Sequence, residues 1–191
     1  MGFRMPKWLV DFGGKIHVAK QPPFITYNPQ FHKLKGREIR NIFNDMEPGD
    51  IFVRSHDGYL SGMAIPGFWA HAGLYIGNNM VAQATTHGVM QEDVLDFFRC
   101  DSAALLRVKG RTHEMVEIAL SKAKRMVKLN IPYDYDFKDF NGKVYCTELI
   151  DIVYDCIFED DFAKDPGGGF SLTPDGLFNS KKVEALRDYR H

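Results

Sequence analysis

The sequence is short of the features that mark several large classes of protein. Three cysteines occur in 191 residues, and this odd, sparse number excludes a disulfide framework and favours a reducing compartment. Lysine and arginine total 24 and aspartate and glutamate total 25, so no basic excess indicates nucleic acid or an anionic membrane as the main partner. No apolar run approaches the length of a membrane span. These absences leave an ordinary globular domain.

The first residues given make a poor match to known targeting signals. The segment MGFRMPKWLVDFGG has no long apolar core and carries Asp11 early, unlike a secretory signal peptide. Gly2 suggests N-myristoylation, but Pro6 stands where that motif needs serine or threonine. We therefore expect a cytoplasmic protein with no integral membrane segment.

The length fits a single domain over residues 1–191, and the sequence patterns divide it into two parts. Residues 1–47 form a mostly irregular N-terminal extension, because the segment KQPPFITYNPQ holds three prolines. Within this extension, KGREIRNIFNDM predicts one short helix. Residues 48–180 hold successive strand and helix patterns and form the core.

Strand patterns dominate the first half of this core, and the longer helices follow. The turn Gly77-Asn78-Asn79 predicts a hairpin between two of the strands. Thr112 can cap a helix that runs to about Leu129, and CTELIDIVYDCIF predicts a further helix whose apolar stripe includes Cys156. The tail is mostly loop, with one turn after Pro174. The predicted class is α+β, an antiparallel sheet packed against helices. The predicted strands lie in PGDIFVRS, FWAHAGLYIG, MVAQAT, HGVMQ and AALLRVK, and a short helix lies in EDVLDFFR.

Among the cysteines, Cys146 has the setting of a nucleophile. It stands where GKVY turns into a helix, so the free N–H groups of the first turn would lower the pKa of its thiol and could hold an oxyanion. Cys100 follows the end of a short helix, where unpaired carbonyls disfavour a thiolate. Cys156 is most simply a small core residue. For Cys146 the alternative is also a buried cysteine without a chemical role.

His71 is the candidate base for this thiol. It is the first residue of the strand in HAGLYIG, and residues at strand ends often contribute to sites at the edge of a sheet. The alternative is a buried core histidine whose ring is hydrogen-bonded. Gln83 is the one polar side chain between apolar neighbours on the next strand, and hairpin pairing places it near His71. A glutamine carbonyl can accept from one ring nitrogen and fix the tautomer. His87, in a turn, is a reserve candidate.

These motifs resemble a known family. HAGLYIG, VAQATTHGV, PYDYDF and YCTELI are similar to the circularly permuted papain-like cysteine enzymes, in particular the YaeF/YiiX-like amidases of the NlpC-type superfamily and, more distantly, the lecithin retinol acyltransferase-like group. The order along the chain also matches, with a histidine first, then a polar residue, then a cysteine. The resemblance covers about residues 48–174 and implies a permuted papain-like fold with the cysteine at a helix N-terminus.

The resemblance implies the roles of four residues. Cys146 would be the nucleophile, His71 the general base and Gln83 the third member. Tyr133 would line the substrate cleft, although simple packing explains it equally well. YiiX-like members more usually carry glutamate in the third position, so we expect that Gln83→Glu keeps or raises the reactivity of the thiol.

The implied activity is that of a thiol hydrolase of the cysteine peptidase or amidase type. It would cleave an amide or ester bond in a small amide, peptide or lipid through an acyl-enzyme on Cys146, with no cofactor and no metal. One alternative is a catalytically weak or inactive relative that acts as a binding module, which the uncharged Gln83 favours. Another is a lipid acyltransferase, in which an acceptor other than water takes the acyl group.

Two further kinds of site find little support. A zinc site built from His71, His87 and Cys146 lacks closely spaced paired ligands. The segment DPGGGF has three glycines but neither the lysine and hydroxyl residue nor the strand–loop–helix context of a phosphate-binding loop.

Overall fold

The computed structural model describes residues 16–18, 25–27, 32–56, 67–135, 141–164 and 170–191. The chain divides into two compact units, residues 1–32 and residues 33–191. In the first unit, β1 (Ile16–Val18) pairs with β2 (Ile25–Tyr27) in an antiparallel ladder. The second unit carries every candidate site residue. The segments 165–169, which include most of DPGGGF, and 1–15 lie outside the described residues.

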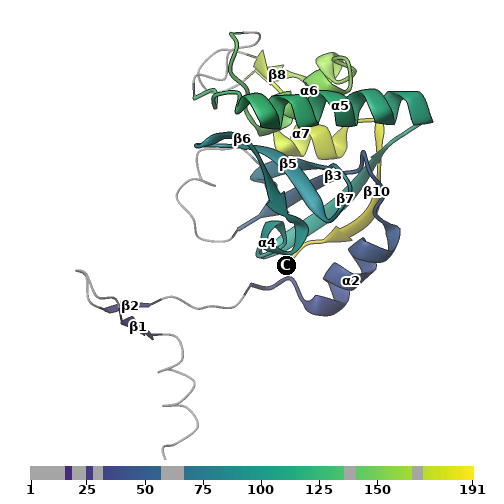
Figure 1. Cartoon of the computed structure of the whole chain (residues 1–191). Helices are drawn as coiled ribbons and strands as arrows, with labels where there is room; N and C mark the ends of the chain where they lie inside the picture. Colours follow the sequence, from purple (N-terminus) through teal and green to yellow (C-terminus); the bar gives the residue numbers. More distant parts are fainter. Residues whose placement is uncertain (1–15, 19–24, 28–31, 57–66, 136–140, 165–169) are drawn as a thin grey trace, which may run out of the picture. The chain divides into compact units, whose positions relative to one another are not determined.

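The second unit is built on a six-stranded antiparallel sheet (Figure 1). The strand order is β10-β7-β3-β4-β5-β6, so the two strands at the centre are β3 and β4. The sheet strands are β3 (Ile51–Ser55), β4 (His71–Tyr75), β5 (Met80–Thr85), β6 (Gly88–Asp93), β7 (Ser102–Val108) and β10 (Val183–Tyr189). A separate two-stranded ladder joins β8 (Ala163–Lys164) to β9 (Phe170–Ser171).

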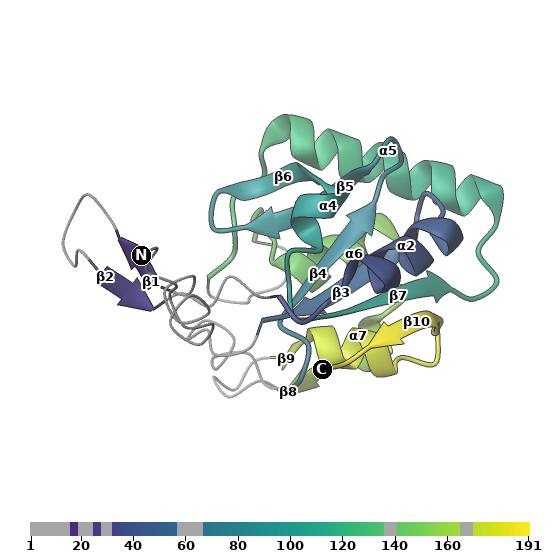
Figure 2. The same ribbon diagram turned by 90° about the horizontal axis from the view of Figure 1, so that it is seen from below.

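Helices cover both faces of the sheet, as Figures 1 and 2 show. The first face carries α5, α6 and α7, and the second face carries α2 and α4. Each face of the sheet carries its own hydrophobic core, because successive side chains of a strand point to opposite faces. In β3, Ile51 and Val53 belong to the core of the first face, and Phe52 belongs to the core of the second face. The helices are α2 (Gly36–Asp45), α4 (Val94–Phe97), α5 (His113–Leu129), α6 (Cys146–Val153), α7 (Pro174–Asn179) and the 3₁₀ turn η1 (Glu159–Asp161). Among the residues that the structure describes, no helix has the length and apolarity that crossing a membrane requires.

Local sequence signals are confirmed where they are strongest. Asn78 and Asn79 have φ values of 53° and 58°, the left-handed conformation expected between β4 and β5. The Thr112 side chain accepts a hydrogen bond from the Met115 N–H at 3.2 Å and begins α5, which ends at Leu129 as predicted. The turn expected after Pro174 is the helix α7.

The prediction for the last long helix is wrong at its end. The helix α6 stops at Val153, and Asp155 and Cys156 adopt φ values of 58° and 61°. The Cys156 N–H closes this turn by donating to the Asp151 carbonyl at 2.8 Å. Cys156 therefore lies beyond the helix and is partly exposed rather than part of an apolar stripe. No glycine marks this stop in the sequence.

Asp50 is structural, at the end of β3 away from the candidate site. Its carboxylate is fully buried and accepts hydrogen bonds from Arg107 at 2.7 and 2.8 Å and from Arg111 at 2.6 Å. It also accepts from the Glu47 N–H at 2.7 Å, which closes the turn before β3. The turn leads into β3, which confirms the strand predicted in PGDIFVRS.

Candidate active site

Cys146 is the first residue of α6, and a local capping contact fixes where that helix begins. Tyr145 precedes it in an extended conformation and donates its N–H to the Glu148 side chain at 3.3 Å, which ties down the start of the helix. The helix is buried on nearly every side because its apolar residues pack under the sheet beside β4. Cys146 itself is only 5% exposed.

This burial changes the electrostatics expected for the thiol. Burial raises the pKa of Cys146, and it outweighs the N–H groups of Ala72, Thr147 and Cys146 itself, which lower the pKa by hydrogen bonding to the sulfur. The expectation that the helix start would leave a lowered pKa is therefore wrong in its net direction. At rest the group is a neutral thiol that already faces backbone donors.

The Ala72 amide places the sulfur beside the strand of His71. The ladder between β4 and β5 holds the pairs Leu74–Ala82 and Tyr75–Val81 and does not reach the start of β4. Where the two strands separate, the Ala72 N–H acts on the Cys146 sulfur. The thiol thus meets β4 one residue after His71.

His71 lies on the second face of the sheet, with its ring centroid 5.9 Å from that of Phe97. Its Nε2 lies 2.7 Å from Oε1 of Gln83, as the sequence pattern led us to expect. Burial, with a further contribution from the Arg54 charge, lowers the pKa of His71 to about 3. The ring is therefore neutral at physiological pH. Because the Gln83 oxygen can only accept, Nε2 carries the proton and Nδ1 keeps its lone pair.

The structure thus gathers Cys146, His71 and Gln83 around one end of β4. Between the described residues, no hydrogen bond joins the Cys146 thiol directly to the His71 ring. Such bonds are commonly long before substrate binds. The thiol approaches from the helix α6, and the histidine and glutamine belong to neighbouring strands of the sheet.

Two charged residues behind Gln83 were not found from the sequence. The Gln83 Nε2 donates to Glu92 Oε2 at 2.6 Å, and Glu92 in turn lies 3.8 Å from Arg54 Nη1. Arg54 is the cross-strand partner of His71. The pairing of β5 with β6 was the signal that could have revealed Glu92, because the register fixes which β6 side chains lie beside Gln83.

Tyr133 lies near the thiol. It forms an isolated bridge with Val144, two residues before Cys146, and its ring centroid is 5.0 Å from that of Tyr135. Burial raises the pKa of Tyr133, and the neighbouring Cys146 raises it further. Tyr133 is therefore a neighbour of Cys146, and its place in a substrate cleft stays a prediction.

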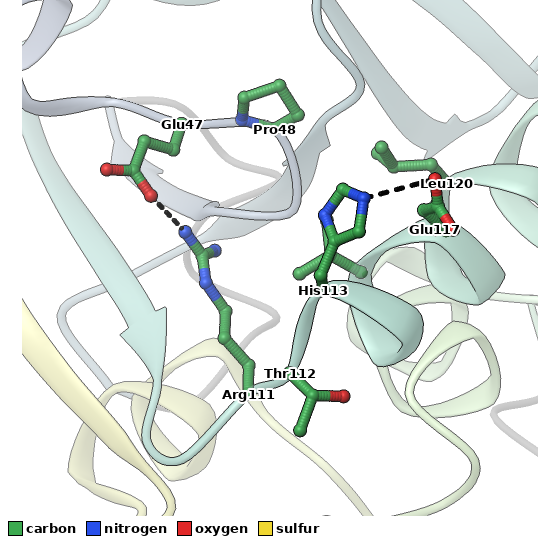
Figure 3. A pocket seen from close by; sticks show the side chains of 8 residues that line it. Glu47, Pro48, Arg111, Thr112, His113, Glu117 and Leu120 are labelled. Atoms are coloured by element: carbon green, nitrogen blue, oxygen red, sulfur yellow. Dashed lines mark hydrogen bonds and ion pairs between the residues drawn. The ribbon is translucent and has the colours of Figure 1, made fainter.

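Three other features were considered as possible sites: a surface cavity, a metal site and His87. A surface cavity of about 510 Å³ is lined by none of the four candidate residues, and four of its polar side chains pair as Glu47–Arg111 and His113–Glu117 (Figure 3). In the described part of the chain, no group of three or more histidine, cysteine, aspartate or glutamate side chains is arranged to hold a metal ion. His87 lies in the exposed turn between β5 and β6.

Comparison with known proteins agrees with this fold. Residues 45–161 match the model of a family described as permuted papain-like amidase enzyme, YaeF/YiiX, C92 family. A solved structure described as metalloprotein yiiX from Escherichia coli O157:H7 has the same fold, with a TM-score of 0.62 and 16% identity over 76% of this chain and 98% of that chain. No curated protein matches the chain.

Proposed function

Because the chain belongs to the permuted papain-like amidase family, we propose that it hydrolyses an amide bond through an acyl-enzyme on Cys146. The Cys146 sulfur attacks the carbonyl carbon while Nδ1 of His71 accepts the thiol proton. The imidazolium then gives this proton to the leaving amine. Water attacks the resulting thioester, with His71 again accepting the proton, and releases the carboxylic acid and the free thiol.

One observation carries the proposal: the Cys146 sulfur faces the backbone amide next to His71 in the sequence. The sulfur lies at the Ala72 amide, and the adjacent His71 is hydrogen-bonded to Gln83 at 2.7 Å. This arrangement supplies a nucleophile, a base and a group that orients the base.

The electrostatics support a base-assisted attack rather than a preformed ion pair. Burial raises the pKa of Cys146 and lowers the pKa of His71 to about 3, so both groups are neutral at rest. Proton transfer then accompanies the attack on the carbonyl. The N–H groups that face the sulfur are suitable donors for the oxyanion that forms. The proposed location is the cytoplasm, which suits three free cysteines.

The test uses p-nitrophenyl acetate, an activated ester that serves as a general acyl donor. We expect a burst of p-nitrophenol and an acetyl adduct on Cys146 by mass spectrometry of the intact protein and its peptides. Cys146→Ala should abolish both, and Cys156→Ser is the matched control that should leave both unchanged.

Two results would contradict the proposal. An acetyl adduct that persists in Cys146→Ala would place the chemistry on another residue. A wild-type protein that forms no adduct under these conditions would favour the binding-module alternative. Release of the acetyl group to added amines or alcohols in preference to water would identify an acyltransferase instead of a hydrolase.

A further inference from the structure

We propose that Glu92 is a positioning residue for this reaction, because it holds the Gln83 amide with its oxygen toward His71 and thereby sets the tautomer of the base. The inference rests on the proposed function and deepens it. Glu92 does not touch the reacting atoms and acts through Gln83. It would supply the charge that Gln83 lacks.

The register of the sheet brings the two side chains together. Gln83 pairs with Met90 and Val81 pairs with Glu92, so Glu92 is the diagonal neighbour of Gln83 on the same face. Gln83 is 2% exposed, whereas the Glu92 side chain is 29% exposed. The carboxylate therefore lies at the border between the buried amide and solvent.

The hydrogen-bond directions leave one consistent arrangement. A carboxylate only accepts, so the Gln83 Nε2 must face Glu92, and the bond measures 2.6 Å. The Gln83 oxygen then faces His71 at 2.7 Å and accepts the proton of its Nε2. If the amide turned over, its NH₂ group would face His71, and the ring would have to carry its proton on Nδ1. A ring in that tautomer could not accept the thiol proton.

Arg54 helps to hold the carboxylate. Its Nη1 lies 3.8 Å from Glu92 and donates to the Phe97 carbonyl at 2.7 Å. Its guanidinium lies 4.2 Å from the centroid of the Phe97 ring. Arg54 is thus anchored by a backbone carbonyl and an aromatic face, and it presents a fixed positive charge to Glu92.

This arrangement reverses the expectation for Gln83→Glu. A carboxylate at position 83 would face the carboxylate of Glu92 across a hydrogen-bond distance, and two like charges cannot both be ionised there without a large cost. We expect this variant to react more slowly than wild type at neutral pH. The exchange Gln83→Glu/Glu92→Gln should recover the rate, because the amide at position 92 can donate to the new carboxylate, which still accepts from His71.

The experiment measures the His71 tautomer and the reactivity of the thiol in the same proteins. Imidazole ¹⁵N NMR at pH 7 reports which nitrogen carries the proton, with the signals assigned by their loss in His71→Asn. The rate of Cys146 alkylation by iodoacetamide is followed by peptide mass spectrometry. The variants are Glu92→Gln, Gln83→Glu and the exchange, and Asp96→Asn is the matched control that removes a charge from the neighbouring helix α4.

We expect Glu92→Gln to shift His71 away from the pure Nε2–H tautomer and to slow alkylation about tenfold, the worth of one charge-assisted hydrogen bond. Asp96→Asn should change neither signal. The inference is overturned if Glu92→Gln leaves the tautomer and the rate as they are, or if the exchange is no faster than Gln83→Glu alone. A tautomer that responds to Glu92 in a protein that forms no acyl-enzyme would uphold the positioning role and contradict the proposed hydrolysis.

Discussion

Replacing His71 with asparagine should make folding stability less sensitive to acid. The pKa of the imidazole is about 3 in the folded protein, chiefly through burial, against 6.5 for the unperturbed group. Between these two values the unfolded chain binds a proton that the folded chain does not bind. The unfolding free energy therefore falls as the pH decreases from about 6.5 toward 3.

The size of the effect follows from the same shift. A pH of 5 is about 1.5 units below the pKa of the unfolded group. At 1.36 kcal/mol per unit, protonation of the unfolded chain lowers the unfolding free energy by about 2 kcal/mol. The residue as a whole is half-buried, so solvent screening reduces this figure. We expect a loss of about 1–2 kcal/mol from His71 alone.

The assay is urea unfolding of the wild type and of His71→Asn at pH 7.5 and at pH 5.0. The wild type should lose about 1–2 kcal/mol more than the variant over this interval. Groups shared by both proteins cancel in the comparison, including Asp151, whose pKa burial raises. Equal acid sensitivity in the wild type and His71→Asn would refute the argument that His71 is buried in its neutral form.

Three further predictions concern the scaffold and are measured by urea unfolding. Asp50→Ala should cost at least about 2 kcal/mol, because it leaves two arginines around a buried site without their partner. Gly73→Ala should lower the unfolding free energy by about 1–3 kcal/mol, because the new Cβ would lie 2.6 Å from the Val81 side chain. Gly36→Ala is the control: its Cβ would meet nothing closer than 3.7 Å, so the unfolding free energy should be nearly unchanged. Thr112→Ala should cost about 1 kcal/mol through loss of the cap of α5, and an unchanged midpoint would contradict that role.

Features of the fold that depend on neighbouring residues could be predicted from the sequence. The glycine and two asparagines between β4 and β5 adopt the positive φ angles that those residue types favour. Thr112 begins α5 because its side chain and the amide that it caps lie within one turn. The position of Cys146 at a helix start is likewise a local matter, and the structure confirms it.

Features that depend on packing between distant segments could not be predicted. The net direction of the Cys146 pKa shift is set by burial under the sheet, which outweighs the local amides. The strand β10 was not predicted, because it forms by pairing with the distant strand β7. The paired residues Val183 and Val108 are about 75 positions apart in the sequence. The link from Gln83 to Glu92 is a diagonal contact between two strands, and the residue pattern of either strand alone does not show it.

The central claim is that His71 activates the thiol of Cys146, and the alkylation rate of Cys146 tests it most directly. Iodoacetamide labelling at pH 7.5 is followed separately for the three cysteines in the wild type and in His71→Asn. Cys100, which is fully buried and has its pKa raised to about 12, is the unreactive reference, and the partly exposed Cys156 is the reference that does not depend on His71. The account predicts that Cys146 is labelled in the wild type and about 100-fold more slowly in His71→Asn, with Cys156 unchanged. A Cys146 rate that is the same in both proteins, or no greater than that of Cys100, would contradict it.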